Sequence, residues 1–224
     1  DENMLIFSSE IKGILNSGLI EPLFNEAAID DYLGYRYVRE PNTFFKNVHH
    51  FKTAYYYQFN ADLSFTCNQY YELPSINFDK SFDENKLTLQ LKHEVEAAVL
   101  RWSISDVRLG CYLSGGVDSS LTTAILAEKT KHQIDTYCIG FSDKNFNEFK
   151  YAEIVAKKYN TNHHEIGMES SDYFNEMDDL IRMKDAPLAV PNEIPLALMN
   201  KRLSDDITVV ISGEGADELF GGYG

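Results

Sequence analysis

Residues 109–120 read LGCYLSGGVDSS, an apolar run that meets two adjacent glycines and then the start of a helical pattern. The apolar residues 109–113 are typical of a buried strand, whereas residues 118–129 have helical periodicity. Between them, Gly115 and Gly116 allow a backbone turn that approaches a ligand closely. A strand that passes directly into a helix in this way predicts an α/β domain with a parallel sheet.

Strands and helices alternate on both sides of this turn. A long amphipathic helix is expected before it, because apolar residues recur near helical spacing at Leu87, Leu91, Val95, Val99 and Trp102. After it we expect strand 134–141, helix 147–159, strand 163–166, helices 171–183 and 193–203, and strand 207–212. This order implies right-handed crossovers and a sheet covered on both faces, with ligands bound beyond the carboxyl ends of the strands.

The glycine-rich turn has the composition of an anion-binding cradle. Ser114, Ser119 and Ser120 offer hydroxyls, and the new helix directs free N–H groups and its positive end to the same place. No lysine of the Walker A pattern is present. A carboxylate at Asp118 is unfavourable beside phosphates unless a cation lies between them, and Mg²⁺ binds carboxylates, waters and phosphate oxygens together. The alternatives are an ordinary glycine-rich turn and an Asp118 that only opens the helix.

A second loop, residues 212–223 (SGEGADELFGGY), follows the last expected strand. It holds the carboxylates Glu214, Asp217 and Glu218 between glycines, and a solvated acidic turn is its simplest interpretation. If it reaches the same sheet edge as the cradle, Asp217 offers a second carboxylate for one metal ion. Ile139 and Gly140 end the strand expected beside the first, where an adenine ring could pack against backbone and an aliphatic side chain.

The amino-terminal part has a different pattern and reads as part of an α+β domain. Its expected elements are a strand at 4–8, a helix from about Ser9 that stops at Gly18, a short helix at 28–35, and strands 54–59 and 63–67 around a turn at 60–62. Residues 74–85, rich in Pro, Ser, Asp and Asn, form a connector. A Pro-rich stretch at 185–195 either lines the site or merely joins two helices.

Composition excludes several classes of protein. The chain has 20 basic and 35 acidic residues and a net charge of −15, so a nucleic-acid partner is not expected. Apolar runs are too short to span a membrane. Cys67, Cys111 and Cys138 are too scattered for disulfides or a CxxC metal site, and Cys111 and Cys138 read as core thiols. With no signal peptide, the expected compartment is the cytoplasm.

Two histidine pairs, His49-His50 and His163-His164, lack metal-binding spacing and read as structural. The chain starts without Met and stops directly after the second loop. We therefore expect it to be a piece of a longer protein.

The two loops together resemble those of glutamine-hydrolysing asparagine synthetases. SGGVDSS is similar to the motif of the wider ATP-pyrophosphatase group, and SGEGADELFGGY narrows the resemblance to the asparagine synthetase branch. Residues 136–141 and 185–195 match that branch, and residues 7–12 and 32–48 are similar to the end of the family's Ntn-hydrolase glutaminase domain. The resemblance implies a glutaminase part at 1–73, a linker at 74–85, and an ATP-pyrophosphatase domain, of the adenine nucleotide alpha hydrolase-like type, at 86–224.

The resemblance also implies roles for individual residues. Contacts to the nucleotide would come from Leu113, Ile139, Gly140, Ser212 and Gly213, and the pyrophosphate portion would be held by Ser114, Gly115, Gly116, Ser119 and Ser120. Asp118 and Asp217 would bind Mg²⁺, and Glu214 would act in forming an acyl-adenylate.

The implied reaction is the ATP-dependent amidation of aspartate. The β-carboxylate would form β-aspartyl-AMP and release pyrophosphate, and ammonia from glutamine would then displace AMP. The family's glutaminase nucleophile lies upstream of Asp1, so this chain alone is expected to be inactive; the full-length protein could be a homodimer. The alternatives are a related ligase that amidates a sugar-linked or secondary-metabolite carboxylate, and a nucleotide-binding paralogue without catalysis, against which intact Asp118, Glu214 and Asp217 argue.

Overall fold

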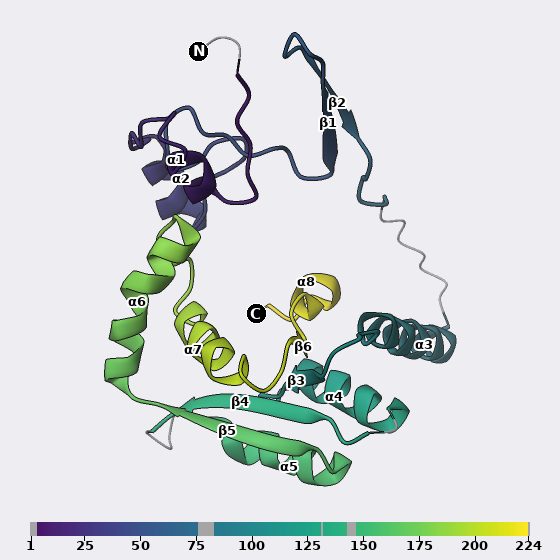
Figure 1. Cartoon of the computed structure of the whole chain (residues 1–224). Coiled ribbons are helices and arrows are strands. Elements are labelled where there is room, and N and C mark those ends of the chain that lie inside the picture. Colours follow the sequence, from purple (N-terminus) through teal and green to yellow (C-terminus); the bar gives the residue numbers. More distant parts are fainter. Residues whose placement is uncertain (1–3, 76–82, 131, 143–146, 224) are drawn as a thin grey trace. The chain divides into compact units, whose positions relative to one another are not determined.

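The computed structural model describes residues 4–75, 83–130, 132–142 and 147–223 (Figure 1). Its contacts divide the chain into two compact units. The first comprises Asp1–Phe78 together with Asp179–Val190, and the second comprises Asp79–Asp178 together with Pro191–Gly224. No helix among the described residues is long and apolar enough to cross a membrane.

The second unit is built on a four-stranded parallel sheet in the order β5-β4-β3-β6. Its strands are β3 (Leu109–Tyr112), β4 (Asp135–Phe141), β5 (Asn162–Met168) and β6 (Val209–Ile211). The predicted α/β class and parallel sheet are confirmed. Its helices are α3 (Glu84–Trp102), α4 (Val117–Lys129), α5 (Phe149–Tyr159), α7 (Glu193–Leu203) and α8 (Ala216–Phe220). Helix α6 (Ser170–Lys184) crosses the boundary, because its residues from Asp179 onward belong to the first unit.

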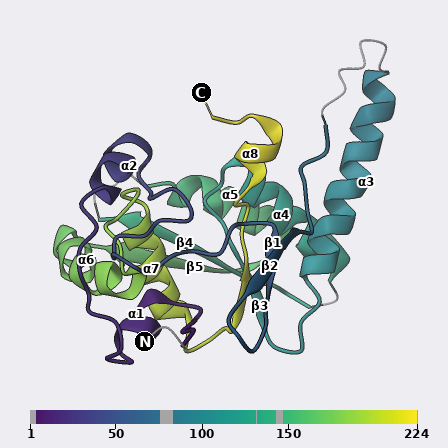
Figure 2. The same cartoon turned by 90° about the horizontal axis from the view of Figure 1, so that it is seen from above.

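Alternating residues of β4 face two different cores, as the period of a strand requires. Tyr137 packs with Met199 and Leu203 of α7 on one face, whereas Cys138 packs with Ala152 and Ala156 of α5 on the other. The sheet is therefore covered on both faces, with α5 and α7 on opposite sides of β4 (Figure 1). Helix α3 lies beside α4 in both views (Figure 1, Figure 2).

The two buried thiols are part of this packing. Cys111 of β3 packs with Leu126 of α4 and with Ile134. Burial raises the pKa of Cys111 to about 12 and that of Cys138 also to about 12. Both therefore stay protonated at neutral pH and lie in the core, as their apolar surroundings predict.

Several boundaries differ from the sequence-based ones for local reasons. Helix α3 begins inside the predicted connector, because the Asp83 side chain accepts hydrogen bonds from the backbone N–H groups of Asn85 and Lys86 at 3.0 and 3.2 Å. Helix α5 begins at Phe149 rather than 147. Strand β5 runs two residues past 166 and β6 is confined to 209–211, while α8 was not predicted. Connector residues 76–82 lie outside the described part of the chain.

The first unit contains α1 (Ile11–Leu15), α2 (Ala28–Tyr35) and an antiparallel hairpin of β1 (Tyr55–Phe59) with β2 (Phe65–Gln69). The predicted second strand, 63–67, was two residues too early. Leu63 has a left-handed φ of 64° and belongs to the turn, which the Asn60 N–H closes by donating to the Ser64 carbonyl at 2.9 Å. The hairpin therefore pairs Phe59 with Phe65.

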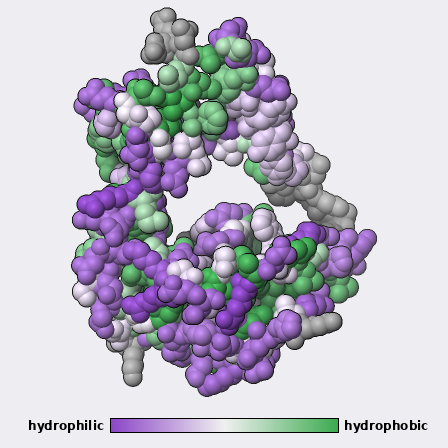
Figure 3. All heavy atoms as spheres, in the orientation of Figure 1, coloured by the Kyte–Doolittle hydropathy of each residue, from purple (hydrophilic) through white to green (hydrophobic). Residues whose placement is uncertain are grey.

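The predicted strand at 4–8 was wrong. These residues carry the β-prone side chains of a strand, but no described strand pairs with them. Phe7 stays 73% exposed. Figure 3 shows apolar surface in the amino-terminal unit, whose exposed side chains include Leu19, Phe24 and Leu33.

A buried carboxylate organises the sheet edge opposite the predicted cradle. Asp135, 4% exposed at the start of β4, accepts from Arg108 Nη2 at 2.9 Å and Asn162 Nδ2 at 2.6 Å. The Nε2 of His164, whose ring stacks on Tyr137, lies 3.2 Å from the same carboxylate. Burial acts most strongly and raises the pKa of Asp135, but the hydrogen bonds from Asn162 and His164 and the charge of Arg108 together outweigh it and lower the pKa.

We expect Asp135→Asn to lower the free energy of unfolding by about 1–3 kcal/mol at pH 7, because a charged, hydrogen-bonded acceptor is lost from a buried position. The carboxylate's contribution is complete above its unfolded pKa of about 3.9 and is lost as the pH falls through its lower folded pKa. In urea unfolding, the difference in free energy of unfolding between wild type and Asp135→Asn should therefore be constant from pH 7 to about 4. Below that pH the difference should become smaller. The exposed Asp106→Asn is the control, and a difference independent of pH down to acid unfolding would contradict the assignment.

Candidate functional site

The two predicted loops leave neighbouring strands at the same edge of the sheet. Strand β3 lies between β4 and β6, with Cys111 paired to Ile211 and Tyr112 paired to Tyr137. Because all three strands are parallel, their carboxyl ends meet at this edge. Leu113 continues β3, buried and with its N–H donating to the Tyr137 carbonyl at 2.8 Å.

Hydroxyl groups close the first loop on itself. The Ser114 and Ser119 hydroxyl oxygens lie 2.9 Å apart, and Ser114 Oγ accepts from the Gly116 N–H at 3.2 Å. Gly116 precedes α4 and caps it without a side chain. The N–H groups of the first turn thus face the loop without a side-chain acceptor, which is the arrangement that favours an anion.

The first loop contains one hydroxyl without a partner and one glycine that is tightly packed. Ser120 Oγ is buried and has no hydrogen-bond partner within the described chain, so an additional acceptor or donor there would satisfy it. Gly115 has a φ of +85°, and a Cβ at this position would lie 2.5 Å from the Tyr151 carbonyl carbon. The turn therefore needs glycine because α5 packs directly against it.

Gly140, where an adenine ring was expected to pack against the backbone, is closely packed by other residues of the chain. A Cβ on Gly140 would lie 2.8 Å from both Asn147 Cβ and Phe149 Cζ. This glycine is thus packed against the residues that lead into α5. Ile139 is partly buried and packs with the core around Tyr137. Their contact with a nucleotide stays a prediction.

The second loop touches the first. A Cβ on Gly213 would lie 3.0 Å from Asp118 Cβ and 3.1 Å from the Ser119 nitrogen, so this backbone lies directly on the start of α4. Next to it, the Glu214 N–H donates to Ser212 Oγ at 3.3 Å and the Glu214 side chain is exposed. Gly213, and with it the segment 212–214, therefore lies beside Asp118 and Ser119 at the start of α4.

The three acidic residues of the second loop have different surroundings. Tyr223 donates to Glu218 Oε1 at 2.6 Å, which lowers the pKa of Glu218 and raises the pKa of Tyr223 to about 12. Asp217, in the first turn of α8, has its carboxylate against Gly222, where a Cβ would lie 1.9 Å from Oδ1. Glu218 is thus occupied, which leaves Glu214 and Asp217 as the acidic candidates.

A metal ion shared by Asp118 and Asp217 stays a prediction. No group of three or more His, Cys, Asp or Glu side chains in the described ranges is arranged to hold a metal. Asp118 and Asp217 offer at most a pair of carboxylates. That donor set suits Mg²⁺, which binds one or two carboxylates and completes its shell with waters and phosphate oxygens.

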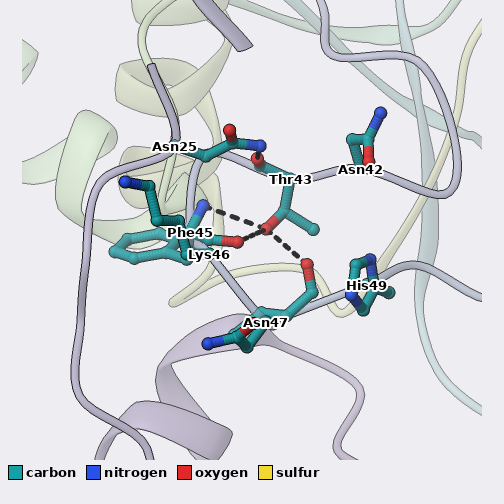
Figure 4. Close-up of a pocket in the computed structure, with 8 residues that line it drawn as sticks. Asn25, Asn42, Thr43, Phe45, Lys46, Asn47 and His49 are labelled. Carbon is teal, nitrogen blue, oxygen red and sulfur yellow. Dashed lines mark hydrogen bonds between the residues drawn. The ribbon is translucent and has the colours of Figure 1, made fainter. Parts of the chain in front are cut away.

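Sequence reasoning missed a small pocket of about 260 Å³ in the first unit (Figure 4). Its centre is Thr43, 2% exposed, whose hydroxyl donates to the Val48 carbonyl at 2.8 Å and accepts from the Phe45 N–H at 3.0 Å. Asn25 Nδ2 donates to the Thr43 carbonyl at 2.9 Å. The two bonds of the Thr43 hydroxyl fix the shape of the 43–48 loop. The Asn25 bond joins this loop to a residue 18 positions away, and the sequence offered no local signal for it.

Comparison with known proteins agrees with this arrangement. The asparagine synthase family profile matches residues 90–224, and the glutamine amidotransferase domain profile matches residues 1–71. The chain is 30% identical to asparagine synthetase [glutamine-hydrolyzing] 1 of Bacillus subtilis over 223 residues, covering 99% of this chain and 34% of the relative. It is 29% identical to asparagine synthetase [glutamine-hydrolyzing] 3 of the same organism, covering 97% and 38%.

Among solved structures, an NH3-dependent NAD synthetase from Campylobacter jejuni superposes with a TM-score of 0.40 at 20% identity, covering 64% of this chain and 62% of that one. The chain spans less than half the length of the two Bacillus relatives. The profile match over residues 90–224, which contain both loops, shows that this chain belongs to the asparagine synthase family.

Proposed function

We propose that the whole protein makes asparagine from aspartate, with ATP as the energy source and ammonia drawn from glutamine. The observation that carries this proposal is the contact of Gly213 with Asp118 and Ser119, because it joins the acidic loop to the anion cradle. Family membership and the amidotransferase match at residues 1–71 support it. Soluble small molecules are thus its proposed partners and the cytoplasm its proposed compartment.

In this proposal the cradle binds the phosphates of ATP. The hydroxyls of Ser114, Ser119 and Ser120 and the backbone at Gly115 and Gly116 hold the portion that leaves as pyrophosphate. Leu113, Ile139, Gly140, Ser212 and Gly213 contact the rest of the nucleotide. Amide groups and hydroxyls fixed in advance stabilise charge that grows on the leaving oxygen without having to reorient during the reaction.

Asp118 and Asp217 would hold Mg²⁺, which would supply positive charge to the phosphate oxygens when bound. Asp118 stands in the first turn of α4 beside the cradle, so its carboxylate would be compatible with bound phosphates only with that charge between them. Asp217 would have to turn from Gly222 toward the cradle. Glu214 follows Gly213 directly and has an exposed side chain, which would orient the carboxylate substrate during adenylate formation.

The chemistry follows from the poor reactivity of a carboxylate. A β-carboxylate oxygen of aspartate attacks the α-phosphorus, the bond from that phosphorus to the bridging oxygen breaks, and pyrophosphate leaves. Ammonia then attacks the activated carbonyl carbon, the carbon–oxygen bond breaks, and AMP leaves while the nitrogen loses a proton. The cradle offers hydroxyls and amides and has no Walker A lysine to reach a γ-phosphate, which favours attack at the α-phosphorus.

Nucleotide product analysis tests this proposal. The whole protein, given ATP, aspartate and ammonia, should release AMP and pyrophosphate in equal amounts with asparagine, and only when aspartate is present. Chromatographic separation of AMP from ADP decides the matter. Dominant release of ADP and phosphate would overturn the adenylation assignment.

A variant pair locates the step. Glu214→Gln should slow adenylate formation by about 10²-fold, while ATP affinity stays within about threefold, because Glu214 stands beside the cradle rather than in it. Glu218→Gln is the matched control, since the Glu218 carboxylate is bound by Tyr223. Equal loss in both variants would remove the role from Glu214.

A further inference from the structure

The connecting segment between α6 and α7, residues 185–192, belongs to two regions at once. By sequence it lies within the match to the asparagine synthase profile, residues 90–224. By contacts, however, the stretch Asp179–Val190 belongs to the first unit, with the residues matched by the glutamine amidotransferase profile. The first half of the Pro-rich stretch is thus bound by the amino-terminal unit, and whether 185–195 lines the nucleotide site stays a prediction.

Lys12 and Asp185 make the central contact. The Lys12 N–H donates to Asp185 Oδ2 at 2.9 Å, and the Lys12 ammonium lies 3.6 Å from the same oxygen. The ammonium also donates to the Met183 carbonyl at 2.5 Å and lies 2.8 Å from Glu10 Oε2. Hydrogen bonding to Glu10 and the charge of Asp185 raise the pKa of Lys12, so the ammonium stays charged at neutral pH.

The backbone at this contact is held in an unusual conformation. Asp185 has a φ of 53°, in the left-handed region that Asp and Asn adopt more readily than most residues with a side chain. The Asp185 side chain is 14% exposed, and its carboxylate interacts with both the backbone N–H and the ammonium group of Lys12. Three residues further on, the Tyr32 hydroxyl donates to the Leu188 carbonyl at 2.6 Å. A cavity of about 370 Å³ lies between this segment and the residues around Lys12 and Tyr32.

The far end of the segment enters the second unit as α7. Ile194 in the first turn of this helix is fully buried, and Asn200 accepts a hydrogen bond from the Tyr112 hydroxyl. Tyr112 ends β3, directly before Leu113 and the cradle. A segment fastened at Asp185 therefore continues, through one short helix, to a side chain bonded to the strand that carries the proposed nucleotide site.

We propose that Lys12 and Asp185 are positioning residues that fasten the connecting segment to the amidotransferase region and thereby couple glutamine hydrolysis to amidation. The coupling role rests on the proposed function. Neither residue would touch ATP, aspartate or glutamine. Their loss would leave each half reaction in place and impair the use of glutamine-derived ammonia by the second half.

The first experiment needs no catalytic activity. Amide hydrogen exchange of residues 185–190 is compared between wild type, Lys12→Met and Asp185→Asn, the latter chosen because Asn tolerates a left-handed φ as well as Asp does. Exchange should accelerate by about three- to tenfold in both variants. Lys46→Met and Asp30→Asn are matched surface controls in the same unit and should leave it unchanged. Unchanged exchange in Lys12→Met and Asp185→Asn overturns the fastening.

The second experiment measures coupling in the whole protein. Asparagine formed per glutamine hydrolysed should fall by about fivefold or more in both variants, while ammonia-dependent synthesis and glutamine hydrolysis each stay within about twofold of wild type. An unchanged ratio, or a parallel loss of ammonia-dependent synthesis, overturns the coupling role. A wild type that releases no AMP with ammonia refutes the proposed function and the coupling with it, whereas accelerated exchange would still support the fastening.

Discussion

Asp118→Asn in the whole protein is expected to lower aspartate-dependent ATP–pyrophosphate exchange by about 10²- to 10³-fold and to leave glutamine hydrolysis unchanged. The substitution keeps the size of the side chain and its place in the first turn of α4, but it removes the charge proposed to hold Mg²⁺ against the phosphates. Exchange of labelled pyrophosphate into ATP measures adenylate formation directly.

The control for Asp118→Asn lies on the same helix. Glu128→Gln, exposed near the far end of α4, should exchange like wild type. Raising the Mg²⁺ concentration should restore part of the exchange lost in Asp118→Asn, because a weakened site is filled by mass action. Full exchange by Asp118→Asn at ordinary Mg²⁺ would show that this carboxylate does not hold the metal.

Gly115→Ala should destabilise the fold more than any other single methyl group added to the cradle. The alanine would adopt a φ of +85°, and its Cβ would lie 2.5 Å from the carbonyl carbon of Tyr151. Left-handed backbone costs about 1–2 kcal/mol and overpacking about 1–3 kcal/mol, so we expect a loss of about 2–5 kcal/mol in urea unfolding.

Gly116→Ala is the matched control for this substitution. Gly116 has an ordinary φ of −69°, and its Cβ would meet only the tip of the Ser114 side chain at 3.3 Å. Its cost should stay within about 1 kcal/mol. Equal unfolding free energies for the two alanine variants would contradict the close packing of α5 against the cradle.

Local patterns were sufficient to predict the parallel sheet and the strand–turn–helix at residues 109–129. Apolar periodicity marks the elements, and glycines mark the turns, because both depend on near neighbours in sequence. The helix at Ala28–Tyr35 agrees with its prediction for the same reason. The family resemblance, carried by the loops at 114–120 and 212–223, is confirmed by the profile match.

Features that depend on distant residues were not predictable. Asp135 looked like an ordinary strand residue, and its burial depends on Arg108 and Asn162 from neighbouring strand ends. The strand expected at 4–8 failed because strand propensity does not specify a pairing partner. The binding of Asp185 by Lys12 joins positions 173 residues apart, and nothing in either local sequence indicates it.

Boundaries failed where a single side chain decided them. Asp83 starts α3 inside a segment whose composition suggested a connector. Asp62 accepts from the Ser64 N–H at 3.1 Å and draws Leu63 into the hairpin turn, so β2 starts later than its apolar pattern indicated. In the second loop, Gly215 has a φ of 90° and precedes the short helix α8. The sequence analysis interpreted these acidic residues as a loop and did not predict the helix.

The transfer of one oxygen atom tests the central claim most directly. Aspartate with ¹⁸O at both oxygens of its β-carboxylate is converted by the whole protein with unlabelled ATP and ammonia. Mass spectrometry then measures the ¹⁸O content of each product. If the carboxylate attacks the α-phosphorus, one ¹⁸O must appear in the phosphate of AMP and the other must remain in the amide of asparagine. Release of ADP in place of AMP, with one ¹⁸O in free phosphate, would show that the acceptor is phosphorylated and would contradict the assignment of the cradle and Glu214 to adenylation.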